Sequence, residues 1–263
     1  MRKIDVAIIA AGGNATRFRP YSLTLPKEML PLNGRPAIEY VIDECIEACI
    51  NKVIIEVKKD NECIKKHLKI HPQYRKYLCS NLDEFDKTSG VAIYIVKGTT
   101  KYKYGNAVSI LSVKEYLQDK IFAVLFADDI IFGKNAIKEL IDLYQNSKAK
   151  SIVAAYYKDD SEVNEYGNIK VDEESKRISM LVQKPKGYIL SNYVVVSRLI
   201  LDYSIFQYID QDEIESDIGL ALNLQMKEYD VLACFITGVW VSIDSPIKYK
   251  NAINIAFEMK GIE

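Results

Sequence analysis

The chain has 263 residues, enough for one large or two small domains with a substantial buried core. Hydrophobic residues make up 49% of it and charged residues 27%, which is the balance of a soluble globular protein. Because 35 basic residues stand against 36 acidic ones, no overall field would draw the chain to nucleic acid or anionic lipid, and we expect neither partner.

The apolar and reactive residues narrow the class further. No apolar run reaches the roughly 18 residues that cross a bilayer, so no membrane contact is expected. The first apolar stretch leads directly into a glycine loop, which argues against a signal peptide. The five cysteines form no Cys-x-x-Cys pair, which favours a reduced, cytoplasmic protein. His67 and His71 have no evident acidic partner, so a solvated or capping role is expected rather than metal binding.

The N-terminal stretch has the pattern of a phosphate site. Val6–Ala10 is an apolar run typical of a buried parallel strand. The small residues at positions 11–15 allow backbone N–H groups to surround an anion, and Arg17 and Lys27 follow as cations. The alternative is an ordinary turn between a strand and a helix, with solvated basic residues.

Strand-like runs alternate with helix-period segments over the first 157 residues, which predicts right-handed βαβ units. The expected strands are Val6–Ala10, Val53–Val57, Val91–Val96, Phe122–Phe126 and Ile152–Tyr156, with helices near Ile38–Cys49, Asn106–Leu117 and Lys134–Gln145. Residues 69–90 are polar and aperiodic, so we expect an insertion there.

The rhythm changes after residue 168, where strand-like pieces become shorter. The expected strands are Asn168–Val171, Ile178–Gln183, Tyr188–Val196 and Val231–Phe235, with helices near Glu213–Met226 and Pro246–Met259. No linker interrupts the chain, so we expect one domain over residues 1–263. Its nucleotide-binding half would cover about 1–157 and its acceptor half about 158–263.

A pair of carboxylates follows one of the expected strands. Asp128 and Asp129 come after Phe122–Phe126, and ligands of open α/β sheets bind at the carboxyl ends of strands. Two carboxylates at such a place are candidates for Mg²⁺, because this ion prefers oxygen ligands. The alternative is a polar turn.

Residues 10–40 read AAGGNATRFRPYSLTLPKEMLPLNGRPAIEY and resemble the opening of the sugar nucleotidyltransferases, closest to the bacterial UTP–glucose-1-phosphate uridylyltransferases. The string PKEMLP at 26–31, shortly after TRF at 16–18, is the most specific part. Similar pieces continue in order toward the C-terminus, namely Gly105–Val108, Ala127-Asp128, Glu165–Gly167, Lys184–Lys186, Ser191-Asn192, Asp212–Ile214 and Ser242–Asp244. The resemblance implies an α/β fold: a Rossmann-like mixed, mostly parallel sheet flanked by helices, in a single GT-A-like domain.

The reaction implied by this resemblance joins an NTP and a sugar 1-phosphate into an NDP-sugar and pyrophosphate, with UTP and glucose 1-phosphate as the expected pair. Such chemistry needs positioning and charge neutralisation more than a covalent nucleophile. The resemblance places the Mg²⁺ ligands at Asp128 and Asp244, which are 116 positions apart. The bland interpretation of Asp244 is a residue at a helix start, and both interpretations are compatible.

Further candidates follow from the same resemblance. Arg17 and Lys27 would hold the triphosphate, and Lys184 would pair with the sugar phosphate. The remaining nucleotide candidates are Ala11, Gly12, Gly13, Asn14, Thr16, Glu28, Lys97 and Gly105, and the sugar candidates are Gly167, Gln183, Asn192 and Tyr193.

Three departures from the family pattern leave the substrates open. β-Carbons on Asn14 and Ala15 narrow the approach to phosphate. Gln183 replaces a glutamate that accepts hydrogen bonds from the sugar. Lys97 replaces a base-reading glutamine, and a lysine has donors only.

Two alternatives therefore remain open. One is the same chemistry with CTP or dTTP, or with an acceptor other than glucose 1-phosphate. The other is a non-catalytic sensor of an NDP-sugar. The sequence leaves the oligomeric state open as well, with a homo-oligomer among the options.

Overall fold

The computed structural model describes residues 3–58, 62–98, 105–210 and 216–260, and the chain forms two compact units. Unit 1 comprises Met1–Ile4, Thr100–Val124 and Ala136–Thr237. Unit 2 comprises Asp5–Thr99, Leu125–Asn135 and Gly238–Glu263. Strand β6 (Ile121–Phe126) begins in unit 1 and ends in unit 2. Neither unit is a continuous half of the chain. The expected division near residue 157, between a nucleotide-binding half and an acceptor half, therefore concerns function and stays a prediction.

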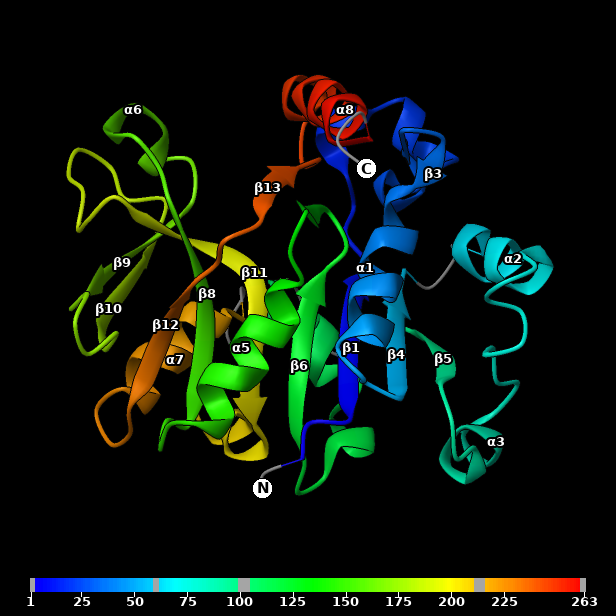
Figure 1. Ribbon diagram of the computed structural model, residues 1–263, viewed down its shortest axis with the longest axis horizontal. Coiled ribbons are helices and arrows are strands. Elements are labelled where there is room, and N and C mark those ends of the chain that lie inside the picture. The colour runs from blue at the N-terminus through cyan, green and yellow to red at the C-terminus, as the bar shows by residue number, and fades with distance from the viewer. Residues whose placement is uncertain (1–2, 59–61, 99–104, 211–215, 261–263) are drawn as a thin grey trace. The chain divides into compact units, whose positions relative to one another are not determined.

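Three parallel strands form the centre of unit 2. They lie side by side in Figure 1 and are β1 (Val6–Ala11), β4 (Lys52–Val57) and β5 (Ala92–Lys97). Every residue of β1 is buried, because a parallel strand covered on both faces needs an unbroken apolar run. The register pairs Ala11 with Val57 and Val57 with Lys97, so the strands end level. The segments that follow them therefore start at one edge.

Short elements and four α-helices complete the described part of unit 2. They are η1 (Thr16–Phe18), η2 (Tyr21–Leu23), η3 (Lys27–Met29), β2 (Pro31–Leu32), β3 (Arg35–Pro36), α1 (Ala37–Glu47), α2 (Cys63–Ile70), α3 (Leu82–Lys87), β7 (Asp129–Phe132), β13 (Val239–Ser242) and α8 (Pro246–Lys260). The pair β7–β13 is antiparallel, and α1 packs against β1. Helix α8 contacts β2, and the Tyr249 hydroxyl donates to the Pro31 carbonyl at 2.8 Å.

Unit 1 contains a mixed sheet in the hydrogen-bonded order β12–β8–β11–β9–β10. Its elements are α4 (Val108–Leu111), η4 (Lys114–Leu117), α5 (Ala136–Gln145), β8 (Ser151–Tyr157), α6 (Asp160–Val163), β9 (Gly167–Val171), β10 (Ile178–Gln183), β11 (Tyr193–Asp202), η5 (Tyr203–Gln207), α7 (Ile218–Gln225) and β12 (Val231–Phe235). Helix α5 packs on β8 and β11, and α7 packs on β10 (Figure 1). This sheet carries the candidate acceptor residues.

Most expected elements are present, and the differences have local causes. The expected helix near Asn106–Leu117 is split into α4 and η4, where the Ser112 hydroxyl donates back to Val108 O at 2.8 Å. The expected strand Tyr188–Val196 begins only at Tyr193 and continues to Asp202. Helix α7 begins at Ile218, capped by the Asp217 side chain. The family-like residues 212–214 and the beginning of the expected helix at 213 lie outside the described residues.

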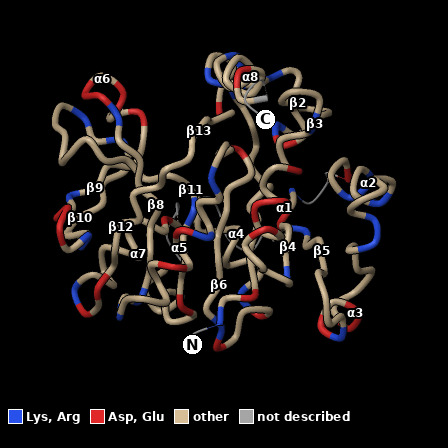
Figure 2. Tube along the Cα trace, viewed as in Figure 1, with Lys and Arg blue, Asp and Glu red and all other residues tan. Residues whose placement is uncertain are grey.

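Charges of both signs are distributed along each unit, as the balanced composition predicts (Figure 2). Within the described residues, no helix combines the length and apolar character needed to cross a membrane. All five cysteines are free thiols.

Candidate functional site

The loop after β1 lies at the carboxyl edge of the parallel strands of unit 2. Ala11 is the buried last residue of β1, whereas Gly13, Asn14 and Thr16 are exposed. Ala15 has a left-handed backbone with φ 44° and ψ 43°, which costs a residue with a β-carbon roughly 1–2 kcal/mol. The loop is therefore open to a ligand and strained at the position where the sequence departs from the family.

Asp128 and Asp244 belong to segments that are hydrogen-bonded to each other. Strands β7 and β13 pair beside them, and the Ile243 N–H donates to the Asp128 carbonyl at 2.8 Å. The Ala127 N–H donates to the Ala10 carbonyl at 3.0 Å, which ties the same segment to β1. The structure thus brings the segments of both predicted metal carboxylates to the loop after β1, although the sequence separates them by 116 positions.

Each of these carboxylates is paired with one of the predicted phosphate-binding cations. Arg17 Nη1 donates to Asp244 Oδ2 at 2.9 Å, and Lys27 Nζ pairs with Asp128. Lys248 Nζ lies 3.6 Å from Asp244 Oδ1. That Asp244 oxygen is buried and accepts no hydrogen bond from the described residues. A carboxylate oxygen with unused acceptor capacity, on a segment hydrogen-bonded to the one that carries Asp128, fits a divalent cation.

The pKa values of Lys27 and its neighbour Glu28 differ from their ordinary values. Burial raises the pKa of Glu28 to about 8, and although Lys27 lowers it, the charges of Asp128 and Glu56 raise it further. Burial alone would lower the pKa of Lys27, but Asp128 and Glu28 raise it above its ordinary value. Lys27 is therefore charged, and Glu28 is largely protonated near neutral pH.

Glu56 is a buried carboxylate that sequence reasoning missed. It lies in β4, level with Ala10, and is 4% exposed. A β-carbon on Gly12 would lie 2.5 Å from Glu56 Oε1, and one on Gly98 would lie 2.2 Å from it. Glu56 Oε2 accepts no hydrogen bond within the described part of the chain. The signal was available, because a charged residue interrupts the apolar run Val53–Val57.

Lys97, the candidate reader of the base, ends β5 on the surface. Its Nζ lies 2.7 Å from Glu62 Oε1, and this hydrogen bond lowers the pKa of Glu62. The side chains are 54% and 40% exposed, so the pair stabilises little. The role of Lys97 toward a base stays a prediction.

In unit 1, Gly105 packs against the segment before α7. Its φ is 124°, and a β-carbon would lie 2.0 Å from the Ser216 carbonyl oxygen, so only glycine fits. Asn106 Oδ1 accepts from the Ile218 N–H at 2.7 Å, and its Nδ2 donates to Asp217 Oδ2 at 3.0 Å. Gly105 thus has a structural role beside the predicted nucleotide contact.

The structure brings three acceptor candidates together at the end of β10. Gly167 and Gln183 are register partners, and a β-carbon on Gly167 would lie 3.1 Å from Gln183 Oε1. Lys184 follows with a left-handed backbone, φ 45°, and its N–H donates to Tyr166 O at 3.1 Å. Gln183 and Lys184 are exposed, so both can meet a ligand.

Asn192 and Tyr193 precede and begin β11, and both make contacts within unit 1. Asn192 Nδ2 donates to the Lys158 carbonyl at 3.0 Å and to Asp160 Oδ1 at 2.6 Å. The ring of Tyr193 lies 4.4 Å from that of Phe235. Their sugar-binding role stays a prediction.

The expectation that the histidines lack an acidic partner is wrong. His67 Nε2 lies 2.7 Å from Glu39 Oε1, and His71 Nε2 lies 3.5 Å from the same atom. The sequence hid this because Glu39 belongs to α1 and the histidines to the end of α2.

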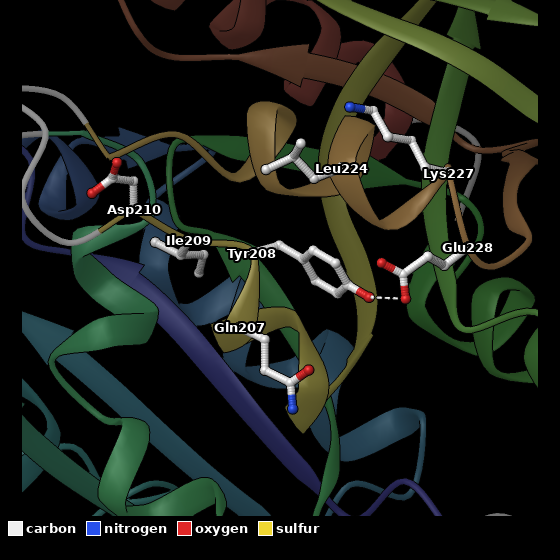
Figure 3. A pocket seen from close by; sticks show the side chains of 7 residues that line it. All are labelled: Gln207, Tyr208, Ile209, Asp210, Leu224, Lys227 and Glu228. Atoms are coloured by element: carbon white, nitrogen blue, oxygen red, sulfur yellow. Dashed lines mark hydrogen bonds between the residues drawn. The ribbon is translucent and has the colours of Figure 1, made fainter.

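A hollow of about 440 Å³ in unit 1 lies between the end of η5 and the end of α7 (Figure 3). Its lining residues are Gln207, Tyr208, Ile209, Asp210, Leu224, Lys227 and Glu228. The Tyr208 hydroxyl donates to Glu228 Oε2 at 3.2 Å across it. The lining includes none of the predicted site residues. The candidate site is therefore defined by the paired charges beside the loop after β1 and not by this hollow.

Comparison with protein families and curated proteins gives consistent similarities. A family model described as "Nucleotidyl transferase" matches residues 6–252. The chain is 34% identical over 218 residues to UTP–glucose-1-phosphate uridylyltransferase 2 of Staphylococcus saprophyticus, covering 80% of this chain and 75% of that protein. It is 31% identical over 239 residues to UTP–glucose-1-phosphate uridylyltransferase of Bacillus subtilis, covering 87% and 80%.

Solved structures show the same similarity in three dimensions. A UDP-glucose pyrophosphorylase complexed with UDP-glucose matches with a TM-score of 0.82 at 26% identity, covering 97% of this chain and 99% of that one. A UTP-bound UGPase from Acinetobacter baumannii matches with a TM-score of 0.81 at 25% identity, covering 99% and 98%. The expected α/β fold, a mixed, mostly parallel sheet flanked by helices, is thereby confirmed.

Proposed function

Because the chain belongs to the nucleotidyl transferase family, we propose that it condenses UTP with glucose 1-phosphate into UDP-glucose and pyrophosphate. The observation that carries this proposal is the meeting of Asp128 and Asp244 with Lys27 and Arg17 beside the loop after β1. Two carboxylates and two cations at a small-residue loop suit a triphosphate and its metal ion.

The triphosphate of the nucleotide would be held by residues of unit 2. Backbone N–H groups of the loop, together with Arg17 and Lys27, would neutralise the triphosphate and hold it for in-line attack. A phosphate oxygen of the sugar 1-phosphate attacks the α-phosphorus, and a new P–O bond forms while the bond to the β-phosphate breaks. Pyrophosphate leaves, and no covalent enzyme intermediate is needed.

Asp128 and Asp244 would hold a divalent cation, which we propose to be Mg²⁺. The fit rests on two carboxylates carried by hydrogen-bonded neighbouring segments, one with a buried oxygen that accepts no hydrogen bond within the described residues. When bound, the ion neutralises phosphate charge and polarises the α-phosphate. Arg17 and Lys27 exchange their carboxylate partners for phosphate oxygens, so neither cation loses an anionic partner.

The sugar 1-phosphate would be held by unit 1. Lys184 is exposed and forms no ion pair with a carboxylate of the described residues, so its charge would be available to the sugar phosphate. Gly167 is buried against Gln183, whose side-chain oxygen would accept a hydrogen bond from a sugar hydroxyl. Asn192 and Tyr193 would line the same pocket.

A second substrate pair is the main competitor. Lys97 carries only hydrogen-bond donors, and the carboxyl group of Glu56 lies against Gly12. The hydrogen-bonding groups that these residues offer to a base therefore differ from those of a glutamine amide, which has donors and an acceptor. Donors alone suit the O2 and N3 acceptors of cytosine, so CTP would then replace UTP. The base of dTTP offers the same hydrogen-bonding groups as uracil, so the pyrophosphate assay, not Lys97, separates dTTP from UTP. Gln183 in place of glutamate leaves room for an acceptor other than glucose 1-phosphate.

Pyrophosphate release from the purified protein tests the proposal. UTP, CTP, dTTP, ATP and GTP are each combined with several sugar 1-phosphates, with and without Mg²⁺. We expect the highest kcat/KM for UTP with glucose 1-phosphate and none without a divalent cation. Turnover of another pair alone would replace the substrates. NDP-sugar binding that Mg²⁺ does not affect, with no turnover of any pair, would identify a sensor.

These substrates are phosphorylated compounds of the cytoplasm, so we place the activity there. The cysteine usage of the sequence predicts the same compartment.

A further inference from the structure

The two histidines of the chain converge on one buried carboxylate in unit 2. Glu39 lies in α1 with its side chain 5% exposed. His67 lies in α2 and His71 caps the end of that helix. The atoms Glu39 Oε1, His67 Nε2 and His71 Nε2 all lie within 4.8 Å of one another. None of these residues belongs to the phosphate or acceptor site described above.

We propose that Glu39, His67 and His71 bind a divalent transition-metal ion of the zinc type. Two histidines four positions apart at a helix end, joined by a carboxylate, form a donor set that suits zinc and leaves a fourth position for water. Tetrahedral Zn²⁺ at its usual bond lengths separates its ligands by about 3.3 Å. The observed separations from Glu39 Oε1, 2.7 Å to His67 and 3.5 Å to His71, lie on either side of that value. Small side-chain shifts are therefore sufficient to admit the ion.

The neighbours of the cluster hold two of its three ligands in place. Arg35 Nε donates to the other oxygen of Glu39 at 3.1 Å, which leaves Oε1 turned to the histidines. The ring of Tyr74 lies 4.6 Å from that of His71 at 32°. The Tyr74 hydroxyl in turn donates to Asp43 at 2.8 Å, and Asp43 accepts from Arg35 at 2.5 Å. Outer contacts of this kind orient metal ligands.

Binding has an identifiable cost at His71. The Gln73 N–H donates to His71 Nδ1 at 3.3 Å, which requires an unprotonated Nδ1. A metal on Nε2 places the proton on Nδ1, so this contact must be given up. At 3.3 Å it is a weak hydrogen bond, and a metal–nitrogen bond outweighs it.

The ion can reach the cluster, and its chemistry separates it from the ion at the phosphate site. The side chains of His67 and His71 are 21% and 27% exposed, so one side of the cluster is open to solvent. Imidazole nitrogens favour Zn²⁺, Co²⁺ or Ni²⁺ over Mg²⁺, whereas Asp128 and Asp244 offer only oxygen. The ion would bridge acidic α1 and basic α2, whose opposite charges Figure 2 displays. We therefore assign the ion a structural role, in which it links α2 to α1.

Zn²⁺ and Co²⁺ titrations of chelator-treated full-length protein test this site. We expect one Zn²⁺ per chain in competition with a chromogenic chelator, and visible Co²⁺ absorption typical of nitrogen-containing tetrahedral coordination. His67→Gln and His71→Gln should each weaken binding about tenfold or more. Zn²⁺ should raise the Tm of the wild type and leave that of His71→Gln unchanged.

Matched variants exclude the other ligands of the chain. The double variant Cys49→Ser, Cys63→Ser removes the more accessible thiols, and Asp128→Asn disables the oxygen site; both should keep the histidine-dependent binding. His71→Gln keeps an amide that can accept from the Gln73 N–H, and circular dichroism checks that it folds. Equal Zn²⁺ affinity of wild type and His71→Gln, loss of binding in the cysteine variant, or no binding by the wild type would each overturn the assignment. The cluster would then be a hydrogen-bond network only.

Discussion

Arg17 Nη1 lies 2.9 Å from Asp244 Oδ2, and this contact joins residues 227 positions apart in the chain. It connects the loop after the first strand with the segment after β13. Together with the pairing of Lys27 and Asp128, it defines a compact cluster of two cations and two carboxylates in unit 2.

Asp128→Asn and Asp244→Asn should each lower kcat/KM by about 100-fold or more, because an amide cannot supply the charge that a divalent cation requires. The circular dichroism spectrum should stay that of the wild type. Asp86→Asn, an exposed change of the same type on α3, is the control and should keep full activity. Near-normal turnover of either site variant would remove that carboxylate from the mechanism.

Glu28 should make stability depend on pH. Its pKa is about 8 in the folded protein and near 4.5 ordinarily, so between these values the folded chain holds a proton that the unfolded chain has lost. The free energy of unfolding should therefore fall as pH rises from about 5 to about 8. Glu28→Gln should reduce that fall by about 1–3 kcal/mol, measured by urea unfolding at both ends of the range. Glu115→Gln, an exposed change, should leave it unaltered, and an equal fall in Glu28→Gln would contradict the assignment.

Ala15→Gly should stabilise the protein. Glycine relieves the left-handed strain at φ 44°, and after the entropy cost of glycine a net gain of about 0.5–1 kcal/mol is expected in urea unfolding. Ala48→Gly is the matched control, because φ of Ala48 is −78° and glycine there should destabilise by a similar amount. Loss of stability in Ala15→Gly would show that the loop is not strained.

Gly105→Ala should destabilise unit 1 by about 2 kcal/mol or more, because the new β-carbon would meet the Ser216 carbonyl at 2.0 Å in a backbone with φ 124°. Gly90→Ala, where a β-carbon meets no atom within 4 Å, should change little. Thermal unfolding distinguishes the two. If Gly105→Ala melts like the wild type while its KM for the nucleotide rises, the residue acts through the ligand alone.

Lys184→Met should raise KM for the sugar 1-phosphate and lower kcat, while the Kd of the nucleotide measured by calorimetry stays within about twofold. The reason is that Lys184 is proposed to touch only the acceptor phosphate. Gln183→Glu should lower KM for the sugar 1-phosphate by about tenfold at most, because it restores a charge-assisted hydrogen bond. Gln207→Glu on η5 is the control for added charge. A change in nucleotide affinity in Lys184→Met would contradict the assignment.

The strands could be predicted because their signal is local. Val6–Ala11 is an unbroken apolar run because this strand is buried on both faces. Val231–Phe235 is apolar because most of its side chains are buried as well. Interruptions were harder to foresee. The break between α4 and η4 depends on a side-chain hydrogen bond at Ser112, and the late start of β11 depends on its pairing with β8.

By itself, the sequence determined the α/β class and, through residues 26–31 and the cations near them, the class of reaction. Only the tertiary structure decided which distant charges meet. The segments that carry Asp128 and Asp244 meet because β7 pairs with β13, and His67 and His71 reach Glu39 because α2 ends beside α1. The burial of Glu28, which raises its pKa, and the burial of Glu56 likewise depend on segments that the local sequence does not identify. Local patterns encode what a segment must bury, whereas the distance between two charges is set by the register and packing of segments far apart in the chain.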